Sequence, residues 1–85
     1  MNDDAFVELA SQAARMAGVD VKRARYIGLV VVAEHLESQA AGRRTAALYT
    51  ETSRDRRIEQ ERATRYETRA RALRSEAGKI AGERS

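Results

Sequence analysis

The chain has 85 residues, of which 34% are charged, and its formal net charge is +3. A chain this short builds only a small hydrophobic core. Because it contains no cysteine, neither disulfides nor thiolate metal sites can reinforce that core. We therefore expect one small domain over residues 1–85 that gains stability from association.

Two features bear on location. The longest apolar run, residues 26–33, is far shorter than the roughly 20 residues of a membrane-spanning helix. The N-terminus is acidic at Asp3 and Asp4, where a signal peptide would be basic. We expect no membrane span, and a protein that is cytoplasmic or enclosed within a virion.

The first predicted helix covers residues 3–17. Asn2 or Asp3 can cap its start, and Gly18 suits the left-handed position that ends a helix. Its apolar residues recur at spacings of three and four, which is typical of one face of an amphipathic helix. That face consists of Phe6, Leu9, Ala10, Ala13, Met16 and Ala17.

The second predicted helix covers residues 20–41, with Asp20 as its cap and Gly42 as its end. Residues 26–33 are apolar on all sides, and their three valines also favour a strand. We prefer a helix, because no other segment could pair with a lone strand and good helix formers follow. A helix that is apolar all round must be covered on several sides, so this segment should be the centre of the fold. Gly28 would permit a close helix crossing there.

The third predicted helix covers residues 43–78, within a long Arg/Glu-rich segment (43–80) followed by a tail (81–85). An apolar stripe spans an arc of about 120° at helical spacing, although it is regular only after Tyr66. The stripe consists of Leu48, Ile58, Tyr66, Ala70, Leu73, Ala77 and Ile80. The sequence leaves open a break near residues 50–53, where Thr and Ser could start a new helix. The fold class is thus all-α, a helical bundle or coiled-coil-like oligomer.

The third helix is much longer than the first two. Either it breaks and folds back, or a partner covers its exposed end. We favour a partner, most simply a second copy of the chain. The last five apolar residues follow a rhythm of four, three, four, three, which is typical of a coiled-coil seam. The expected oligomer interface is Tyr66, Ala70, Leu73, Ala77 and Ile80.

The sequence offers no set of catalytic residues. The lone His35 lies in no HExxH motif, and no glycine-rich phosphate-binding loop is present. Glu51, Asp55 and Glu59 have a spacing that could bind a hard cation, but pairing with nearby arginines is the stronger expectation. We expect no enzyme, no metal site and no cofactor.

Residues 12–30 resemble a helix-turn-helix pattern, with Ala14, Gly18, Val19 and Ile27 at the corresponding positions. The resemblance implies that the second helix enters the major groove of DNA through its first turns. The residues at the reading positions would be Asp20, Lys22, Arg23 and Arg25. Two departures weaken the match: Ala24 replaces a larger residue, and a helix that is apolar all round leaves no bare face for reading.

Residues 43–74 hold ten arginines and five acidic residues. The arginines could contact phosphates, with Arg54, Arg56, Arg57 and Arg65 as candidates. Tyr66 is the only aromatic residue from position 54 to 74, so base stacking is not expected. The alternative is a solvated helix surface in which charges four apart neutralise one another. Those pairs would be Arg57–Glu61, Glu61–Arg65 and Glu67–Arg71.

Together these features predict a non-enzymatic helical interaction protein that acts as an oligomer. We expect it to be associated with nucleic acid, as a regulator or accessory factor of a phage or mobile element. Its partners would be its own copies or another helical protein, and nucleic acid through phosphate contacts. The alternative is a structural or adaptor subunit of a larger assembly, such as a phage particle, with no direct nucleic-acid role.

Overall fold

The computed structural model describes residues 2–82, which form three helices and, within that range, no strand. They are α1 (Asp3–Met16), α2 (Val21–Leu48) and α3 (Ser53–Gly82). The molecule is a rod of 49 × 25 × 17 Å. The predicted all-helical bundle is confirmed, and residues 26–33 are helical rather than extended.

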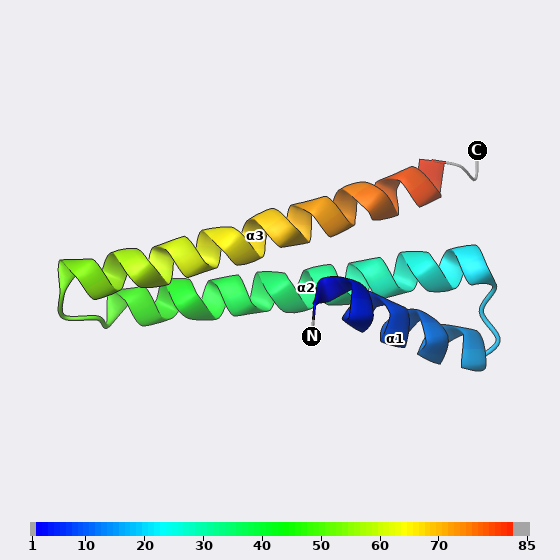
Figure 1. Ribbon diagram of the computed structural model, residues 1–85, viewed down its shortest axis with the longest axis horizontal. Coiled ribbons are helices and arrows are strands. Elements are labelled where there is room, and N and C mark those ends of the chain that lie inside the picture. Colours follow the sequence, from blue (N-terminus) through cyan, green and yellow to red (C-terminus); the bar gives the residue numbers. More distant parts are fainter. Residues whose placement is uncertain (1, 83–85) are drawn as a thin grey trace.

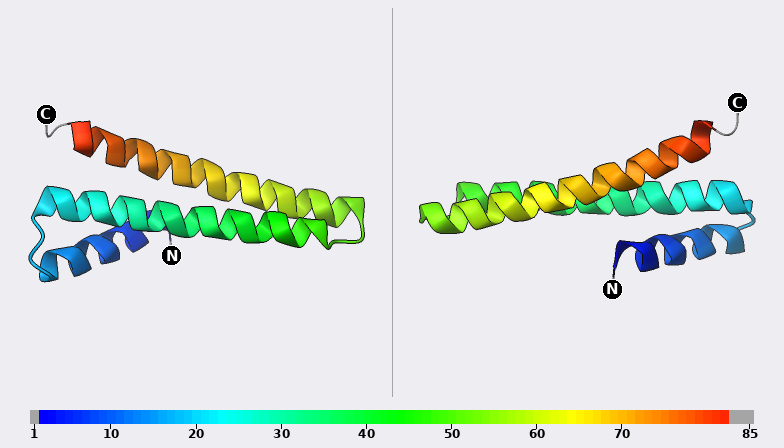
Figure 2. Two further views of the ribbon diagram at one scale, coloured as in Figure 1. Left: turned by 180° about the vertical axis from the view of Figure 1, so that it is seen from behind. Right: turned by 45° about the horizontal axis from the view of Figure 1, so that its top comes forward.

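The helices α2 and α3 form a long antiparallel hairpin, and α1 folds back along the first half of α2 (Figure 1). Seen from behind and from above, α1 and α3 pack on different sides of α2 (Figure 2). The rod therefore has two unlike ends. All three helices meet at the three-helix end, and only α2 and α3 continue to the two-helix end.

Local signals set the ends of α1 as predicted. The Asn2 Oδ1 accepts a hydrogen bond from the Ala5 N–H at 2.9 Å, and Asp20 caps α2 in the same way through the Arg23 N–H at 3.1 Å. After α1, Gly18 has a φ of 94°, which side chains other than glycine rarely adopt. The Gly18 N–H bonds to the Arg15 carbonyl, so the last turn of α1 is satisfied.

The predicted boundary between the second and third helices is wrong. The helix does not end at Gly42 but continues to Leu48, so residues 43–48 belong to α2. Glycine costs only about 1 kcal/mol inside a helix, and the strong helix formers around Gly42 outweigh that cost. The break lies at residues 49–52 and overlaps the stretch near residues 50–53 that the sequence left open. The Thr52 Oγ1 caps α3 by accepting a hydrogen bond from the Asp55 N–H at 3.1 Å.

The end of α3 also differs from the prediction. The helix continues past residue 78 to Gly82, so the first two residues of the expected tail are helical. The rest of that tail, residues 83–85, lies outside the described residues. This length places the end of α3 beside the start of α2, as the shared lining of one hollow by Tyr26 and Ile80 shows.

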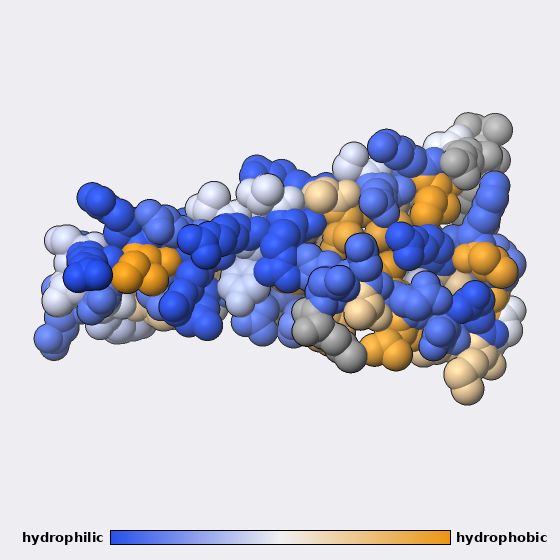
Figure 3. Space-filling model, viewed as in Figure 1, coloured by the Kyte–Doolittle hydropathy of each residue, from blue (hydrophilic) through white to orange (hydrophobic). Residues whose placement is uncertain are grey.

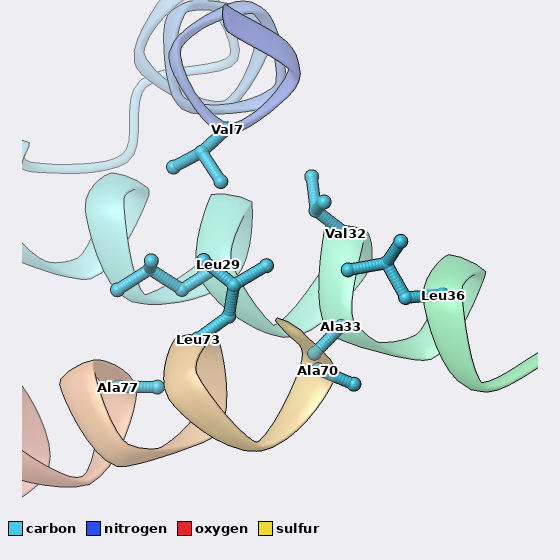
Figure 4. Packing of buried hydrophobic residues seen from close by; sticks show 8 residues of the cluster. All are labelled: Val7, Leu29, Val32, Ala33, Leu36, Ala70, Leu73 and Ala77. Atoms are coloured by element: carbon cyan, nitrogen blue, oxygen red, sulfur yellow. The ribbon is translucent and has the colours of Figure 1, made fainter. Parts of the chain in front are cut away.

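The hydrophobic core lies at and near the three-helix end, where side chains from all three helices converge on α2 (Figure 4). Val7 and Leu29 are fully buried, and Leu73 reaches them from α3. The complete cluster is Val7, Leu29, Val32, Ala33, Leu36, Ala70, Leu73 and Ala77. Toward the two-helix end the buried hydrophobic residues are alanines, Ala40, Ala47 and Ala63.

This core corrects the expected coiled-coil seam. Ala70, Leu73 and Ala77 are buried within the same chain, and Tyr66 and Ile80 are half-buried beside them. The stripe exists, but the fold-back of α3 provides α2 as its cover. These three buried side chains therefore need no partner.

The crossing of α1 over α2 depends on Gly28, as the sequence suggested. A Cβ at Gly28 would lie 2.7 Å from the Val7 carbonyl oxygen and would collide with the Ser11 Oγ. The Ser11 hydroxyl itself is satisfied by donating to the Val7 carbonyl at 2.7 Å. Only small groups fit at this crossing, so α1 turns its Val7–Ser11 side toward α2.

The apolar face predicted for α1 consequently points largely away from the core. Phe6, Leu9 and Met16 are 46%, 54% and 88% exposed. The sequence correctly identified an amphipathic helix, but the tight fit at Gly28 decided which side is buried. The large apolar side chains of α1 remain at the surface.

Candidate nucleic-acid interface

Arginine–carboxylate pairs connect the helices along the rod. Arg74 on α3 donates two hydrogen bonds to Glu37 on α2, both at 2.7 Å. Arg69 on α3 binds Asp3 on α1 in the same bidentate way, with an Nε–Oδ2 distance of 2.7 Å. Such two-pronged pairs fix geometry more strongly than single contacts do.

Three further pairs join α2 to α3. They are Arg25–Glu76, Arg43–Glu59 and Arg44–Glu67. Glu59 is shared, since Arg62 on its own helix also contacts it at 3.2 Å. These pairs occupy carboxylates along much of the length of α3.

The pairs also affect ionisation. Hydrogen bonds from Arg69 hold the pKa of Asp3 below its usual range, despite an opposing effect of partial burial. Hydrogen bonds from Arg74 lower the pKa of Glu37, and those from Arg44 lower the pKa of Glu67. All three carboxylates are therefore favoured in the charged form that the interhelical bonds need.

The predicted neutralisation within α3 is wrong. Among residues 2–82, no ion pair joins Arg57 or Arg65 to Glu61. Arg71 forms no ion pair with Glu67 either, because Arg44 holds that carboxylate, but the charge of Arg71 still helps to lower the Glu67 pKa. The carboxylates of α3 mostly face α2, and the outward arginines are left without them.

Four arginines form a row on the outer side of α3, which we call the α3 arginine row. Its members are Arg54, Arg57, Arg65 and Arg71. At about 100° per residue they fall within an arc of about 120° on the side of α3 opposite its buried residues. All four are exposed, and within the described chain none takes part in an ion pair. Arg71 donates a 3.4 Å hydrogen bond to the Thr68 hydroxyl, and its charge helps to lower the pKa of Glu67.

The row has little negative charge around it. Between its first and last members, Glu61 is the one acidic residue within the same arc. Arg57, Glu61, Thr64 and Arg65 line a shallow hollow together with Gln60. The arrangement offers guanidinium donors directed to solvent from a rigid helix, which suits contact with phosphates.

The other residues expected to bind nucleic acid do not join this row. Lys22, Arg23 and Arg25 lie in the first turns of α2, separated from Arg54 by about the 42 Å length of that helix. Arg25 is paired with Glu76. Arg56 lies near the row but donates to the Thr50 carbonyl at 3.3 Å, so it helps to close the turn instead.

The helix-turn-helix resemblance does not extend to the structure. In that motif the two helices meet at about 90–120°. Here α1 returns along α2, as the contacts of Gly28 with Ser11 and Val7, more than a turn from the connecting residues, demonstrate. The first turn of α2 is exposed at residues 21–23, so the departure from the motif lies in the direction of α1, which runs back beside α2 (Figure 2).

The phosphate-binding candidates identified from the sequence did not include Arg71, because its spacing of four residues from Glu67 predicted an ion pair between them. Helical spacing alone would have placed Arg71 on the outer arc with Arg57. What the spacing could not show is that Arg44, brought close by the hairpin, takes the carboxylate. Whether these arginines have an ion-pair partner within the described residues thus depends on tertiary structure.

Two other kinds of feature are absent from the described residues. Residues 2–82 contain no group of three His, Cys, Asp or Glu side chains placed to hold a metal ion. Glu51, Asp55 and Glu59 do not form such a group, and the Glu59 carboxylate is paired with Arg43 and Arg62. None of α1, α2 and α3 has an apolar stretch long enough to cross a bilayer.

No family model, no curated protein and no solved structure matches this chain. The strongest local feature is the α3 arginine row, whose arc on α3 holds four arginines and one acidic residue, Glu61.

Proposed function

We propose that this protein is a non-enzymatic, nucleic-acid-associated helical module that binds the phosphate backbone through the α3 arginine row. This role suits a regulator or accessory factor of a phage or mobile element. One observation carries the proposal: arginines of α2 hold three of the five carboxylates of α3, while the outer arginines of α3 form no ion pair within residues 2–82.

The row fits backbone contact better than base reading. From Arg54 to Arg71 it extends about 25 Å along a straight helix. The row contains no aromatic side chain, and Tyr66 is half-buried against the core beneath Arg69, so base stacking has no platform here. Contacts of this kind position a protein on nucleic acid without reading its sequence.

The expected binding is strongly salt-dependent. Each phosphate that an arginine neutralises releases counterions, and four contacts predict a loss of affinity of roughly 10² between 50 and 200 mM salt. Binding should be measured by fluorescence anisotropy with a labelled duplex of about 20 base pairs and a single strand of equal length, over a range of salt concentrations.

The decisive variant is Arg57→Gln with Arg65→Gln. We expect at least a tenfold loss of affinity at low salt, and a salt slope reduced by about two contacts. The matched control is Arg15→Gln with Arg25→Gln, which removes the same charge near the other end of the rod. Equal losses from both double variants would show a general effect of net charge, and no binding of the unaltered protein at low salt would refute the proposal outright.

A second candidate is a structural or adaptor subunit with no direct nucleic-acid role. It is favoured by the exposed apolar side chains of α1 and by the extended shape of the rod. The same titrations separate the two, because an adaptor of this kind would bind neither the duplex nor the single strand.

A further inference from the structure

The apolar segment of α2 has three sides, and two neighbouring helices, α1 and α3, cover two of them. Residues 26–33 are apolar all round. α1 covers the side of Gly28, and α3 covers the side of Leu29 and Ala33. On the third side Ile27 is only half-buried and Val31 is 49% exposed.

Side chains from α1 extend this third side into a continuous surface. Phe6 and Leu9 flank a groove of about 450 Å³ that Val31 borders from α2. Ala10, Val32 and His35 complete the lining, which contains no acidic or basic residue apart from the histidine. We define the apolar face as Phe6, Leu9, Ile27 and Val31. Apolar residues gather at this end of the rod, whereas the two-helix end is mostly hydrophilic (Figure 3).

The size of this face matches one half of a modest interface. Its exposed apolar area is on the order of 300 Å², the size of patch that often has a function on a monomer. Two such faces would bury about 600 Å² of apolar surface, which forms the centre of an interface at the small, weak end of the range. A small core also leaves a chain of this length with much to gain from association.

The rim of the face carries a charge pattern that suits a copy of itself. Arg23 and Glu34 are eleven residues apart on α2, so they share one side of the helix about 16 Å apart. Neither is within ion-pair distance of an opposite charge among residues 2–82, although Glu34 acts at longer range on Arg74 and helps to raise its pKa. If a second α2 runs antiparallel across a two-fold axis midway between them, each Arg23 meets the Glu34 of the other copy. The same axis places Ile27 against Val31.

We propose that the apolar face is a homodimer interface, formed by two copies of the chain with their α2 helices antiparallel about a two-fold axis. In a two-fold interface every contact occurs twice, so one acid and one base on a single helix yield two ion pairs. The expected seam thus moves from the buried stripe of α3 to the third side of α2.

This interface does not rest on the proposed nucleic-acid function. The apolar face is formed by α1 and α2, although Ile27 also lines a hollow with Ile80 and Ala81 of α3. Since the α3 arginine row lies on the side of α3 opposite its buried residues, a dimer leaves the row of both copies exposed. Dimerisation and phosphate binding can therefore fail separately.

Sedimentation equilibrium of the full chain tests the proposal. We expect a monomer–dimer equilibrium with a Kd in the micromolar range, as a small interface predicts. Leu9→Glu with Val31→Glu should raise the Kd at least a hundredfold. Both positions are half-exposed in the single chain, so circular dichroism should show unchanged helix content. As a control, Arg57→Gln with Arg65→Gln should leave the Kd unchanged.

A charge exchange tests the antiparallel geometry specifically. Arg23→Glu should weaken the dimer about tenfold, and adding Glu34→Arg should restore it, because the two ion pairs are then re-formed with their signs reversed. A chain that stays monomeric at about 200 µM, or a double exchange that dimerises no better than Arg23→Glu alone, would overturn the proposal.

Discussion

The two ends of the rod are held together by different means. At the three-helix end, Leu29, Leu73 and Val7 bury branched side chains from all three helices. At the two-helix end, the buried hydrophobic residues are alanines, and Arg43 and Arg44 bridge to acids of α3. Exposed ion pairs contribute little, with a median of about 0–1 kcal/mol each, whereas a buried leucine contributes several times more. The stability of the molecule should therefore be concentrated at one end.

The largest expected effect comes from removing a core side chain. Leu29→Ala should lower the free energy of unfolding by about 3 kcal/mol, because Leu29 is fully buried and its loss leaves a cavity. Urea unfolding followed by circular dichroism measures the change. The matched control is Leu48→Ala at the other end, where the side chain is 78% exposed and little change is expected. Similar losses at both ends would contradict the comparison.

The two glycines of α2 sharpen the contrast and should respond in opposite directions. Gly28→Ala should destabilise by about 1–3 kcal/mol, since the new Cβ would press on the backbone of α1. Gly42→Ala should stabilise by about 0.5–1 kcal/mol, because open space surrounds it within a regular helix. Thermal unfolding of both variants measures the shifts. A loss of stability in Gly42→Ala would mean that α2 is not continuous there.

The smallest expected effect is a decrease in the stability of the fold at low pH. Asp3, Glu37 and Glu67 have lowered pKa values in the folded chain. In the unfolded chain their pKa values return to about 3.9–4.3. The charged forms therefore stabilise the fold above about pH 4, and this contribution is lost as the pH falls through the folded-state values.

Urea unfolding at a series of pH values should show a modest decline in stability below about pH 4. Arg74→Gln should reduce that decline, because the Glu37 pKa then moves back toward its ordinary value. Arg57→Gln is the control, since Arg57 has no carboxylate partner within residues 2–82 and lies outside the proposed dimer interface. An acid response that is the same in Arg74→Gln as in the unaltered chain would exclude this ion pair as a source.

The sequence predicted what depends on local chemistry. The caps at Asn2 and Asp20, the end of α1 at Gly18 and the close crossing at Gly28 all follow from residue types whose preferences act within a few positions. The threonines before α3 allowed a break in the helix, but the sequence also allowed a continuous helix. In the first case the chain folds back to cover the apolar stripe, and in the second a partner covers it. Burial alone could not distinguish them.

The sequence could not predict which face of α1 is buried or which arginines are left unpaired. Hydrophobicity pointed to Phe6 and Leu9, but the shape of α2 at Gly28 selected the smaller side. The spacing along α3 predicted that Arg71 would pair with Glu67, but the hairpin brings Arg44 of α2 into contact with that carboxylate instead. In both cases a residue on another helix, Gly28 or Arg44 of α2, decides the contact. The pattern of residues along α1 or α3 alone does not include that residue.

The separation between the connecting turn and the core also bears on how the chain folds. Leu29 and Leu73 are 44 positions apart, whereas the turn at residues 49–52 lies at the opposite end of the rod. Zippering from that turn forms only alanine contacts at first, and direct closure of the long loop costs about 2 kcal/mol more entropy than a tight turn. The hairpin must grow through its weakest part before it reaches the contacts that make it stable. The barrier to folding should therefore be set by the pairing of Leu29 with Leu73, late in the growth of the hairpin.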